Sequence, residues 1–375
     1  MFKIITYRPQ NEAEKEALTP YGRQEITVYR LEFEDSYIEV SNYGAALRKF
    51  FSTGLEAVVA YANPYLDLEH GKNYFGSVLT PFAGRYRDAS GAVVLHSGPE
   101  GGARKFWDLV DAREESMILE LCEEGVKYRA SYQLAGEGEL ELELSAEGSY
   151  EGPINLGFHP YFNLSKYPDV KLQELRLSLD HAYLPDSQNL PVFAEASPLA
   201  HTALDYAHGR RNIASAMTRA AKQPERPLNH SVLDLGGIDH YFFQAERLEA
   251  VARGETLPLA KQARLYAPDT GASLEVYSDA PGLVVYSGQF AGEHEAGPGA
   301  LELTANRLTS SFCGLALEPQ LPPNGQVDEA LASAYQLRPG ECWTRRMRYV
   351  LTPGENLYLG PDAANFQIFD DPFEL

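Results

Sequence analysis

The sequence is poor in cysteine, with only Cys122, Cys313 and Cys342 among its 375 residues. An odd, sparse set of this kind is not a disulfide framework, and no pair has the spacing of zinc ligands. The N-terminus lacks the uninterrupted apolar core of a secretory signal peptide. No stretch approaches the ~20 apolar residues that cross a bilayer. These absences argue against a small disulfide-stabilised domain and a membrane span, and they predict a cytoplasmic protein.

Positive charge is also scarce, because 32 Lys and Arg face 53 Asp and Glu, which gives a formal net charge of -21. Nucleic acids and anionic lipids are bound through Lys and Arg side chains that neutralise phosphate groups. We therefore expect neither a nucleic-acid partner nor a membrane surface. Hydrophobic residues make up 44% of the chain and charged residues 23%, which is ordinary for a globular protein with a buried core.

What the sequence does contain is alternation of apolar and polar residues. In 126–134 every second residue is apolar or small, and in 139–144 glutamates alternate with leucines. A period of two places one set of side chains on each face of a sheet, so these segments predict strands with one buried face. With 117–121 before them and glycines at the turns, they form a predicted antiparallel meander.

Further short strands are predicted at 26–33, 37–40, 175–179, 273–277, 283–287 and 344–351. Helical patterning is limited to two short segments, 212–222 and 327–335. Residues 186–236, rich in Pro, Asn, His and Arg, are interpreted as a long excursion from the sheets. Many strands with few helices predict an all-β fold of the sandwich type.

His159 is the first candidate for chemistry. It lies in the segment Asn-Leu-Gly-Phe-His-Pro-Tyr-Phe-Asn-Leu, at 155–164, among aromatic residues and with asparagines on both sides. An imidazole with a pKa near neutrality can donate a proton at a pH where other side chains cannot. The alternative is a hydrogen-bonded core histidine within an aromatic cluster.

Glu318 is the second candidate. An apolar run at 315–317 delivers it directly before Pro319, which biases the preceding residue toward an extended conformation. A glutamate partly desolvated at a strand end has a raised pKa and is a better general base. The alternative is an exposed glutamate at a strand terminus.

Three further residues have the chemistry to hold a polar ligand. Arg85 and His96 stand near glycines and Trp107, so that donors, close backbone approach and an aromatic platform occur together. Asp239 follows two glycines and precedes aromatic residues, where its carboxylate can accept hydrogen bonds from hydroxyls. A surface arginine beside a turn and an ordinary turn aspartate are the plainer explanations.

Several catalytic signatures are absent. The chain has no G-x-S-x-G elbow, no P-loop, no H-E-x-x-H and no dinucleotide-binding fingerprint. The remaining histidines are scattered without ligand spacing, so we predict no metal.

Taken in order, these segments resemble the aldose 1-epimerase (galactose mutarotase) family. The resemblance is carried by Gly84-Arg85, by His96 with Trp107 eleven residues later, by 157–164, by Asp239 before an aromatic strand, and by Glu318 with Gln320 before a proline-rich loop. It runs from about residue 25 to 351 and implies a large antiparallel β-supersandwich. We therefore expect an N-terminal extension (1–24), a mutarotase-like β-sandwich domain (25–351) and an acidic C-terminal tail (352–375).

The resemblance also implies roles for the matching residues. His159 corresponds to the acid that protonates the sugar ring oxygen, and Glu318 to the base that takes the proton of the C1 hydroxyl. The residues that correspond to ligands of the sugar hydroxyls are Arg85, His96, Asp239 and Gln320. The expected partner is a small-molecule aldose, no cofactor is needed, and we expect a monomer or homodimer.

The chemistry explains why an acid and a base are both needed. A cyclic hemiacetal opens when its anomeric hydroxyl loses a proton while its ring oxygen gains one, and each positioned group contributes typically ~10²–10⁴-fold. We expect His159 to start charged and Glu318 to start ionised. Three features depart from the family pattern: a short segment between Arg85 and His96, Phe158 where many relatives have Asn, and Val284 where some have Gln.

Three other functions remain open from the sequence. A hexose-6-phosphate mutarotase would need a cluster of cations, for which the candidates are Arg85, Arg87, Arg104 and Lys105. A non-catalytic carbohydrate-binding protein could use the same scaffold. A glycoside hydrolase or lyase is the third, although a hydrolase usually places two carboxylates across the bond, and here the pair is His and Glu.

Overall fold

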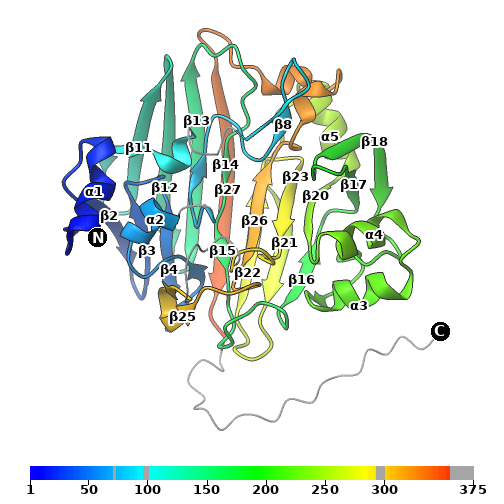
Figure 1. Cartoon of the computed structure of the whole chain (residues 1–375), viewed down its shortest axis with the longest axis horizontal. Helices are drawn as coiled ribbons and strands as arrows, with labels where there is room; N and C mark the ends of the chain where they lie inside the picture. The colour runs from blue at the N-terminus through cyan, green and yellow to red at the C-terminus, as the bar shows by residue number, and fades with distance from the viewer. Residues whose placement is uncertain (71–72, 96–100, 293–299, 355–375) are drawn as a thin grey trace.

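The computed structural model describes residues 1–70, 73–95, 101–292 and 300–354 of the chain. Antiparallel strands dominate it, as the alternating sequence predicts (Figure 1). His96, and the predicted C-terminal tail from residue 355 on, lie outside the described residues.

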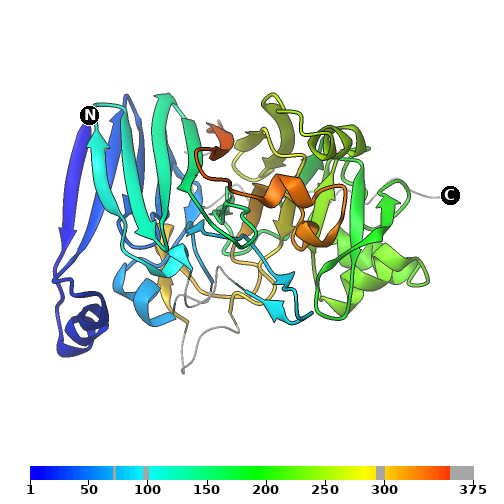
Figure 2. The same cartoon turned by 90° about the horizontal axis from the view of Figure 1, so that it is seen from above.

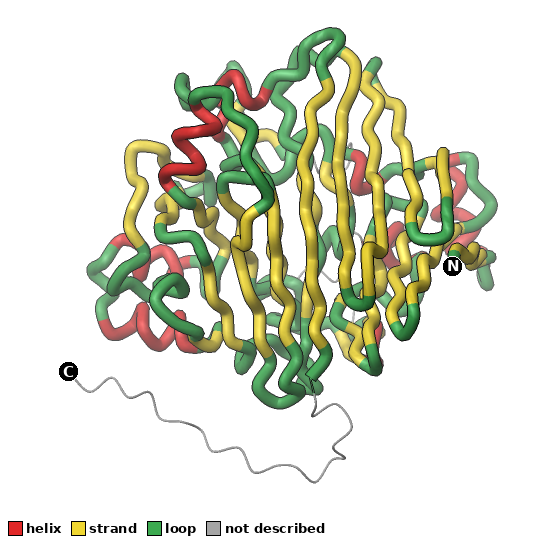
Figure 3. Tube along the Cα trace, turned by 180° about the vertical axis from the view of Figure 1, so that it is seen from behind, coloured by secondary structure: helices red, strands yellow, loops and turns green. Residues whose placement is uncertain are grey.

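The largest sheet has nine strands, and the view from behind shows it face-on, with its long strands side by side (Figure 3). Its strands, in spatial order, are β10 (Asp108–Ala112), β11 (Ser116–Glu123), β12 (Val126–Gly136), β13 (Glu139–Gly148), β27 (Cys342–Thr352), β22 (Ser273–Ser278), β21 (Ala260–Tyr266), β16 (Glu174–Leu177) and β19 (Arg211–Asn212). The predicted meander is confirmed as β11, β12 and β13. In β12 every second side chain is buried, from Val126 to Leu134, because that face covers the core.

A second sheet of seven strands carries most of the residues singled out in the sequence. Its strands, in order, are β18 (Pro191–Pro198), β17 (His181–Pro185), β20 (Asp239–Phe243), β23 (Gly282–Tyr286), β26 (Leu315–Gln320), β15 (Tyr161–Phe162) and β6 (Val58–Val59). All six residues of the inner strand β26 are buried, so both faces of this strand are covered. This explains why 315–317 is a continuous apolar run and does not alternate.

A third sheet is formed by the N-terminal part of the chain: β1 (Phe2–Tyr7), β2 (Ile26–Phe33), β3 (Ser36–Ser41), β4 (Leu47–Ser52) and β5 (Leu55–Glu56). Strand β1 pairs with β2 from end to end, so the first residues of the chain are part of a sheet. Three short pairs complete the strands: β7 (Val78–Leu79) with β14 (Gly157–Phe158), β8 (Tyr86–Arg87) with β9 (Val93–Val94), and β24 (Glu302–Leu303) with β25 (Arg307–Leu308).

The helices are short and lie around the sheets (Figures 1 and 2). They are α1 (Glu12–Leu18), α2 (Tyr65–His70), α3 (Ser215–Lys222), α4 (Pro227–Asp234) and α5 (Ala245–Ala252), with 3₁₀ turns η1 (Thr19–Tyr21), η2 (Gly102–Arg104), η3 (Thr304–Asn306), η4 (Gly325–Val327) and η5 (Ala332–Tyr335). None of the helices in the described ranges is long and apolar enough to cross a membrane.

The helix predictions were only partly right. Helix α3 confirms the predicted helix at 212–222, except that it begins at Ser215. The predicted helix at 327–335 is wrong, because Asp328 is extended and separates the 3₁₀ turns η4 and η5. The segment 186–236 is less of an excursion than predicted, since β18 and β19 are edge strands of the two large sheets. A short edge strand carries little periodicity, so the sequence does not reveal it.

The main hydrophobic core is formed by buried side chains of the nine-stranded, the seven-stranded and the N-terminal five-stranded sheets. Phe158 contacts Tyr132 of β12 and Tyr349 of β27 edge-on, with ring centroids 6.2 and 5.9 Å apart. Phe162 of β15 approaches the same Tyr349 ring at 5.5 Å. The segment 157–164 is therefore fixed to the core on one side, which leaves its other side free to face a cavity.

Candidate active site

A cavity of about 320 Å³ opens beside the seven-stranded sheet, a volume in the usual range for small-ligand sites. It collects residues from far apart in the chain, including five of the six predicted site residues. Those five are Arg85, His159, Asp239, Glu318 and Gln320. The remaining one, His96, lies outside the described residues, although its neighbour Leu95 lines the cavity.

His159 is held by its own backbone between β14 and β15. Its N–H donates to the carbonyl of Ser77 at 3.0 Å, and its carbonyl accepts from the N–H of Gly76 at 2.9 Å. The imidazole lies 5.0 Å from the ring of Tyr161, centroid to centroid, and its Nδ1 is buried with no hydrogen-bond partner in the described ranges. The other ring nitrogen, Nε2, is the atom that lies near Glu318, the second catalytic candidate.

Glu318 meets His159 directly, since its Oε1 lies 3.3 Å from His159 Nε2. The carboxyl is delivered by β26, where Glu318 pairs with Val284 of β23. Only 6% of the Glu318 side chain is exposed, against 14% for His159. The alternative of an exposed glutamate at a strand terminus is therefore wrong, and both His159 and Glu318 line the cavity.

Burial decides the charge of this pair. It lowers the pKa of His159 to about 4 and raises the pKa of Glu318 well above its ordinary range, with the nearby Asp239 carboxylate adding to the rise. Without a ligand the site therefore favours a neutral imidazole beside a carboxylic acid. This differs from the expectation of a charged His159 and an ionised Glu318, because the sequence does not show how completely the two groups are desolvated.

Asp239 begins β20 and is held from two sides. Its Oδ2 accepts a hydrogen bond from Asn189 Nδ2 at 2.6 Å. Its backbone N–H donates to Nδ1 of His240, whose Nε2 lies 2.8 Å from the Ser231 hydroxyl. Burial raises the pKa of Asp239 to about 6, against the lowering effect of the Arg85 charge and of the Asn189 hydrogen bond. Asp239 is thus available as an acceptor mainly above that pH.

Asn189 is a cavity residue that the sequence analysis missed. It lies in the turn between β17 and β18 with φ 57°, a left-handed conformation that asparagine tolerates well. The same turn is tied down by Asp186, which accepts from the backbone N–H groups of Gln188 and Leu190. Nothing in the local sequence distinguishes this asparagine from an ordinary turn residue, because its partner Asp239 is 50 positions away.

Gln320 is fully buried, yet neither its amide oxygen nor its amide nitrogen has a hydrogen-bond partner among the residues that the structure describes. Space for this side chain depends on Gly157, where a Cβ would come within 3.0 Å of Gln320 Oε1. Buried polar atoms are almost always paired in folded proteins. An unpaired amide in the wall of a cavity therefore indicates a position that a ligand completes.

Arg85 stands at the exposed side of the cavity, where its Nη1 donates to the backbone carbonyl of Gln188 at 3.4 Å. Two of the other candidate cations for a phosphate are already engaged with acids. Arg87 pairs with Asp186, and Lys105 pairs with Glu123, each at 2.6 Å. These ion pairs weaken the argument for a phosphate pocket.

The aromatic platform is not where the sequence suggested. Trp107 is 1% exposed, donates from Nε1 to the carbonyl of Gly102 and belongs to the main core, so its role as a platform is wrong. Phe158, which departs from the family pattern, also belongs to the core, whereas Val284 does line the cavity. The rings that line the cavity are those of Tyr74, Tyr161, Tyr286 and Phe290.

Among the described residues, no group of three or more His, Cys, Asp or Glu side chains could hold a metal ion.

Comparisons with known proteins identify the family to which the chain is similar. A sequence model of the family described as aldose 1-epimerase matches residues 27–350. The chain is 28% identical over 365 residues to the galactose mutarotase of Sus scrofa, covering 89% of this chain and 96% of that protein. It is 27% identical over 275 residues to the aldose 1-epimerase of Escherichia coli K12, covering 70% of this chain and 71% of that protein. The crystal structure of galactose 1-epimerase from Lactobacillus acidophilus superposes with a TM-score of 0.70 at 22% identity, covering 94% of this chain and 99% of that one.

Proposed function

Because the chain belongs to the aldose 1-epimerase family, we propose that His159 and Glu318 perform the two proton transfers through which it interconverts the α and β anomers of a free aldose. The observation that carries this assignment is the 3.3 Å distance between His159 Nε2 and Glu318 Oε1 in the wall of one cavity.

The distance suits the reaction. The ring oxygen and the anomeric hydroxyl oxygen of a hemiacetal are bonded to the same carbon, so the acid and the base that serve them must lie close together. Carboxyl pairs in glycoside hydrolases are usually about 5–9.5 Å apart, with room for a leaving group or a water between them. The contact between His159 and Glu318 therefore supports ring opening over glycoside hydrolysis.

The protonation of the pair fits the same scheme. A neutral imidazole with a carboxylic acid contains the same number of protons as an imidazolium with a carboxylate. Transfer of the Glu318 proton to His159 Nε2 thus creates the acid and the base without exchange with solvent. His159 then protonates the ring oxygen while Glu318 accepts the proton of the C1 hydroxyl, and reclosure on the other face of the aldehyde reverses both transfers.

The remaining polar residues are proposed to hold the sugar. Asp239 accepts hydrogen bonds from hydroxyl groups, and the unpaired amide of Gln320 can both donate and accept. Arg85 donates from the exposed side of the cavity, and His96 stays a predicted ligand from the sequence. The rings of Tyr74 and Tyr286 offer flat apolar surfaces to the C–H faces of a pyranose.

Polarimetry of freshly dissolved α-D-glucose and α-D-galactose tests the proposal. Glu318→Gln and His159→Asn are each expected to lower the enzyme-catalysed rate by about 10²–10⁴-fold, because each removes one proton-transfer group. Sugar binding, measured by calorimetry, is expected to persist in both variants. Matched controls are Glu249→Gln and His230→Asn, two exposed positions on α5 and α4, which are expected to keep the wild-type rate.

A near-full rate in either active-site variant would remove its assigned role. Binding of sugar by the wild type with no acceleration of mutarotation would identify a binding protein. Faster mutarotation of glucose 6-phosphate than of glucose would favour the phosphorylated substrate class. A cytoplasmic location and a monomeric or homodimeric state are also proposed, and light scattering after size-exclusion chromatography tests the second.

A further inference from the structure

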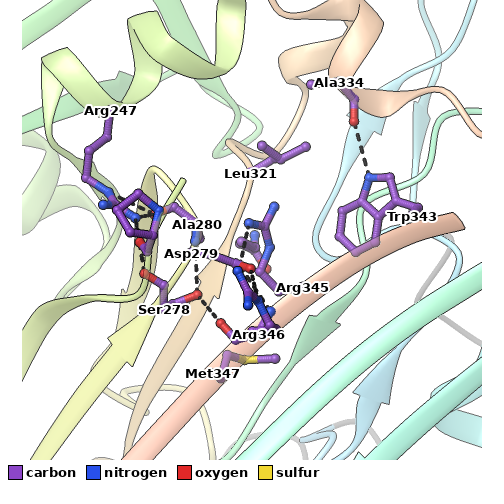
Figure 4. Close-up of polar contacts among 12 residues, drawn as sticks. Arg247, Ser278, Asp279, Ala280, Leu321, Ala334, Trp343, Arg345, Arg346 and Met347 are labelled. Carbon is purple, nitrogen blue, oxygen red and sulfur yellow. Dashed lines mark hydrogen bonds and ion pairs between the residues drawn. The ribbon is translucent and has the colours of Figure 1, made fainter. Parts of the chain in front are cut away.

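A second cavity, of about 390 Å³, lies at the start of β27 between the end of α5 and the turn η5. It shares no lining residue with the active-site cavity. Its lining combines an apolar patch with polar side chains, and the Arg345 guanidinium lies beside that patch (Figure 4). The apolar patch is formed by Trp343 with Val251, Leu257, Leu321, Ala334 and Leu337.

Arg345 points inward from β27, and its side chain is only 7% exposed. Nη1 donates to Asp279 Oδ1 at 3.1 Å, while Nε is buried and has no partner within the described segments. The guanidinium carbon lies 5.2 Å from the centroid of the Trp343 ring, and the indole is itself fixed by its Nε1 bond to the carbonyl of Ala334 (Figure 4). One edge of a buried cation is therefore left without an acceptor.

The local charge is also unbalanced, because Asp279 is the acidic partner of two arginines. Besides Arg345 it accepts from the backbone N–H and from Nε of Arg346, both at 3.0 Å. A third arginine, Arg247, lies nearby and donates to the carbonyls of Ser278 and Ala280 (Figure 4). Burial and the charge of Arg345 lower the pKa of Arg247, with Asp279 opposing them. Three guanidiniums thus cluster around one carboxylate, in a chain whose net charge is -21.

The acids at the rim do not restore the balance. Glu255 pairs with Arg253 at 2.6 Å and Glu341 pairs with Arg338 at 3.6 Å, so each already has its own arginine. Arg346 is 46% exposed and is solvated, but Arg345 is not. Buried charges are normally paired, so the free edge of Arg345 is the place for an added anion.

We propose that this cavity binds a small organic carboxylate, with its carboxylate on the free edge of the Arg345 guanidinium and its apolar body against Trp343 and the leucines. A guanidinium edge offers two parallel N–H donors that match the two oxygens of a carboxylate. A single unsatisfied edge beside the apolar patch around Trp343 fits a singly charged, amphipathic anion better than a phosphate dianion, which would require more donors. The proposal does not depend on the function of the first cavity.

The chain offers its own reporter for the test, because it has two tryptophans and Trp107 belongs to the core. In a Trp107→Phe variant, Trp343 is the sole indole, and its emission is followed during titration with sodium cyclohexanecarboxylate. Sodium chloride at equal ionic strength provides the blank. We expect a saturable change with the carboxylate only, and calorimetry on the unmodified chain is expected to give the same dissociation constant.

Two arginine variants form a matched pair, since both remove a guanidinium from Asp279 but only Arg345 lines the cavity. Arg345→Gln is expected to weaken binding by roughly tenfold or more, as loss of a charge-assisted hydrogen bond does. Arg346→Gln is expected to stay within about threefold of the wild type, because it affects the site only through charge at a distance. Catalysed mutarotation reports whether each variant is folded.

Ser333→Asp provides a second route if Arg345→Gln does not fold. Ser333 is exposed and lines the cavity, so an added carboxylate there is expected to weaken binding of the anion while the protein stays folded. The proposal is overturned if the carboxylate gives no saturable change beyond the salt blank, or if Ser333→Asp and a folded Arg345→Gln both bind like the wild type. Binding of inorganic phosphate in preference to cyclohexanecarboxylate would overturn the assigned ligand class.

Discussion

Replacing Asn189 by alanine isolates one contact that controls the charge of Asp239. Burial raises the pKa of Asp239 to about 6, and the Asn189 hydrogen bond at 2.6 Å is one of the two influences that keep it from rising further. A donor to a carboxylate stabilises the ionised form, so its removal raises the pKa. Because Asp239 is proposed to accept hydrogen bonds from the sugar as a carboxylate, the active form of the site is lost as the pH falls through this pKa.

The size of the change follows from the contact. A hydrogen bond to a charged group is worth about 1.5–3 kcal/mol, and 1.36 kcal/mol corresponds to one pKa unit. In a plot of kcat/KM against pH, the wild type is expected to lose activity below a pH near 6. Asn189→Ala is therefore expected to shift this acid limb to higher pH by about one to two units. At pH 7 this lowers kcat/KM by about twofold to tenfold, and the value recovers at pH 9.

The assay is polarimetric, with kcat/KM measured from pH 5 to pH 9 and the uncatalysed rate subtracted at each pH. Gln188→Ala is the matched control, because this neighbour contacts Arg85 only through its backbone carbonyl. Its acid limb is expected to coincide with that of the wild type. The reasoning is refuted if the Asn189→Ala limb stays where the wild-type limb is, or if activity is lost equally at every pH.

Two further substitutions separate binding from stability. Gln320→Leu removes an amide for which the described part of the chain offers no partner, so the free energy of unfolding is expected to stay level or rise by about 1 kcal/mol. KM is expected to rise by about fivefold or more with little change in kcat. Denaturant titration measures the stability, and polarimetry measures KM and kcat. An unchanged KM would contradict the sugar-binding role. Gly76→Ala places a Cβ 1.9 Å from the carbonyl of Leu47 at φ +67°, beside the bond that holds His159. Gly76→Ala is expected to lower the free energy of unfolding by about 2–4 kcal/mol. Gly22→Ala is the control and is expected to lower it by about 1 kcal/mol, because φ there is +63° but no described atom lies within 4 Å of the new Cβ. Equal losses in the two variants would contradict the packing argument.

The fold was largely predictable because strand alternation is a local property. The glutamates and leucines of 139–144 alternate along the chain, and β13 buries its leucines accordingly. The helices were predicted less well. Helix α4, with Pro227 at its start, and helix α5 are each eight residues long, so neither carries enough apolar periodicity to stand out in the sequence.

The site was predictable in its members but not in its electrostatics. The setting of His159 among aromatics and the position of Glu318 at the end of an apolar run identified both, and the family resemblance supplied their roles. Their contact at 3.3 Å joins residues 159 positions apart in the chain. Their pKa values depend on burial by side chains from several strands, which no local pattern encodes.

The sequence by itself determined the all-β architecture, the family and the residue types of the proposed acid, base and hydroxyl ligands. Only the tertiary structure decided that the imidazole and the carboxyl group are both desolvated, that Asn189 reaches Asp239, and that Trp107 supports the core while tyrosines line the cavity. It also revealed the unbalanced arginine cluster around Asp279. The physical reason is that periodicity is set by neighbours along the chain, whereas burial and charge balance are set by neighbours in space.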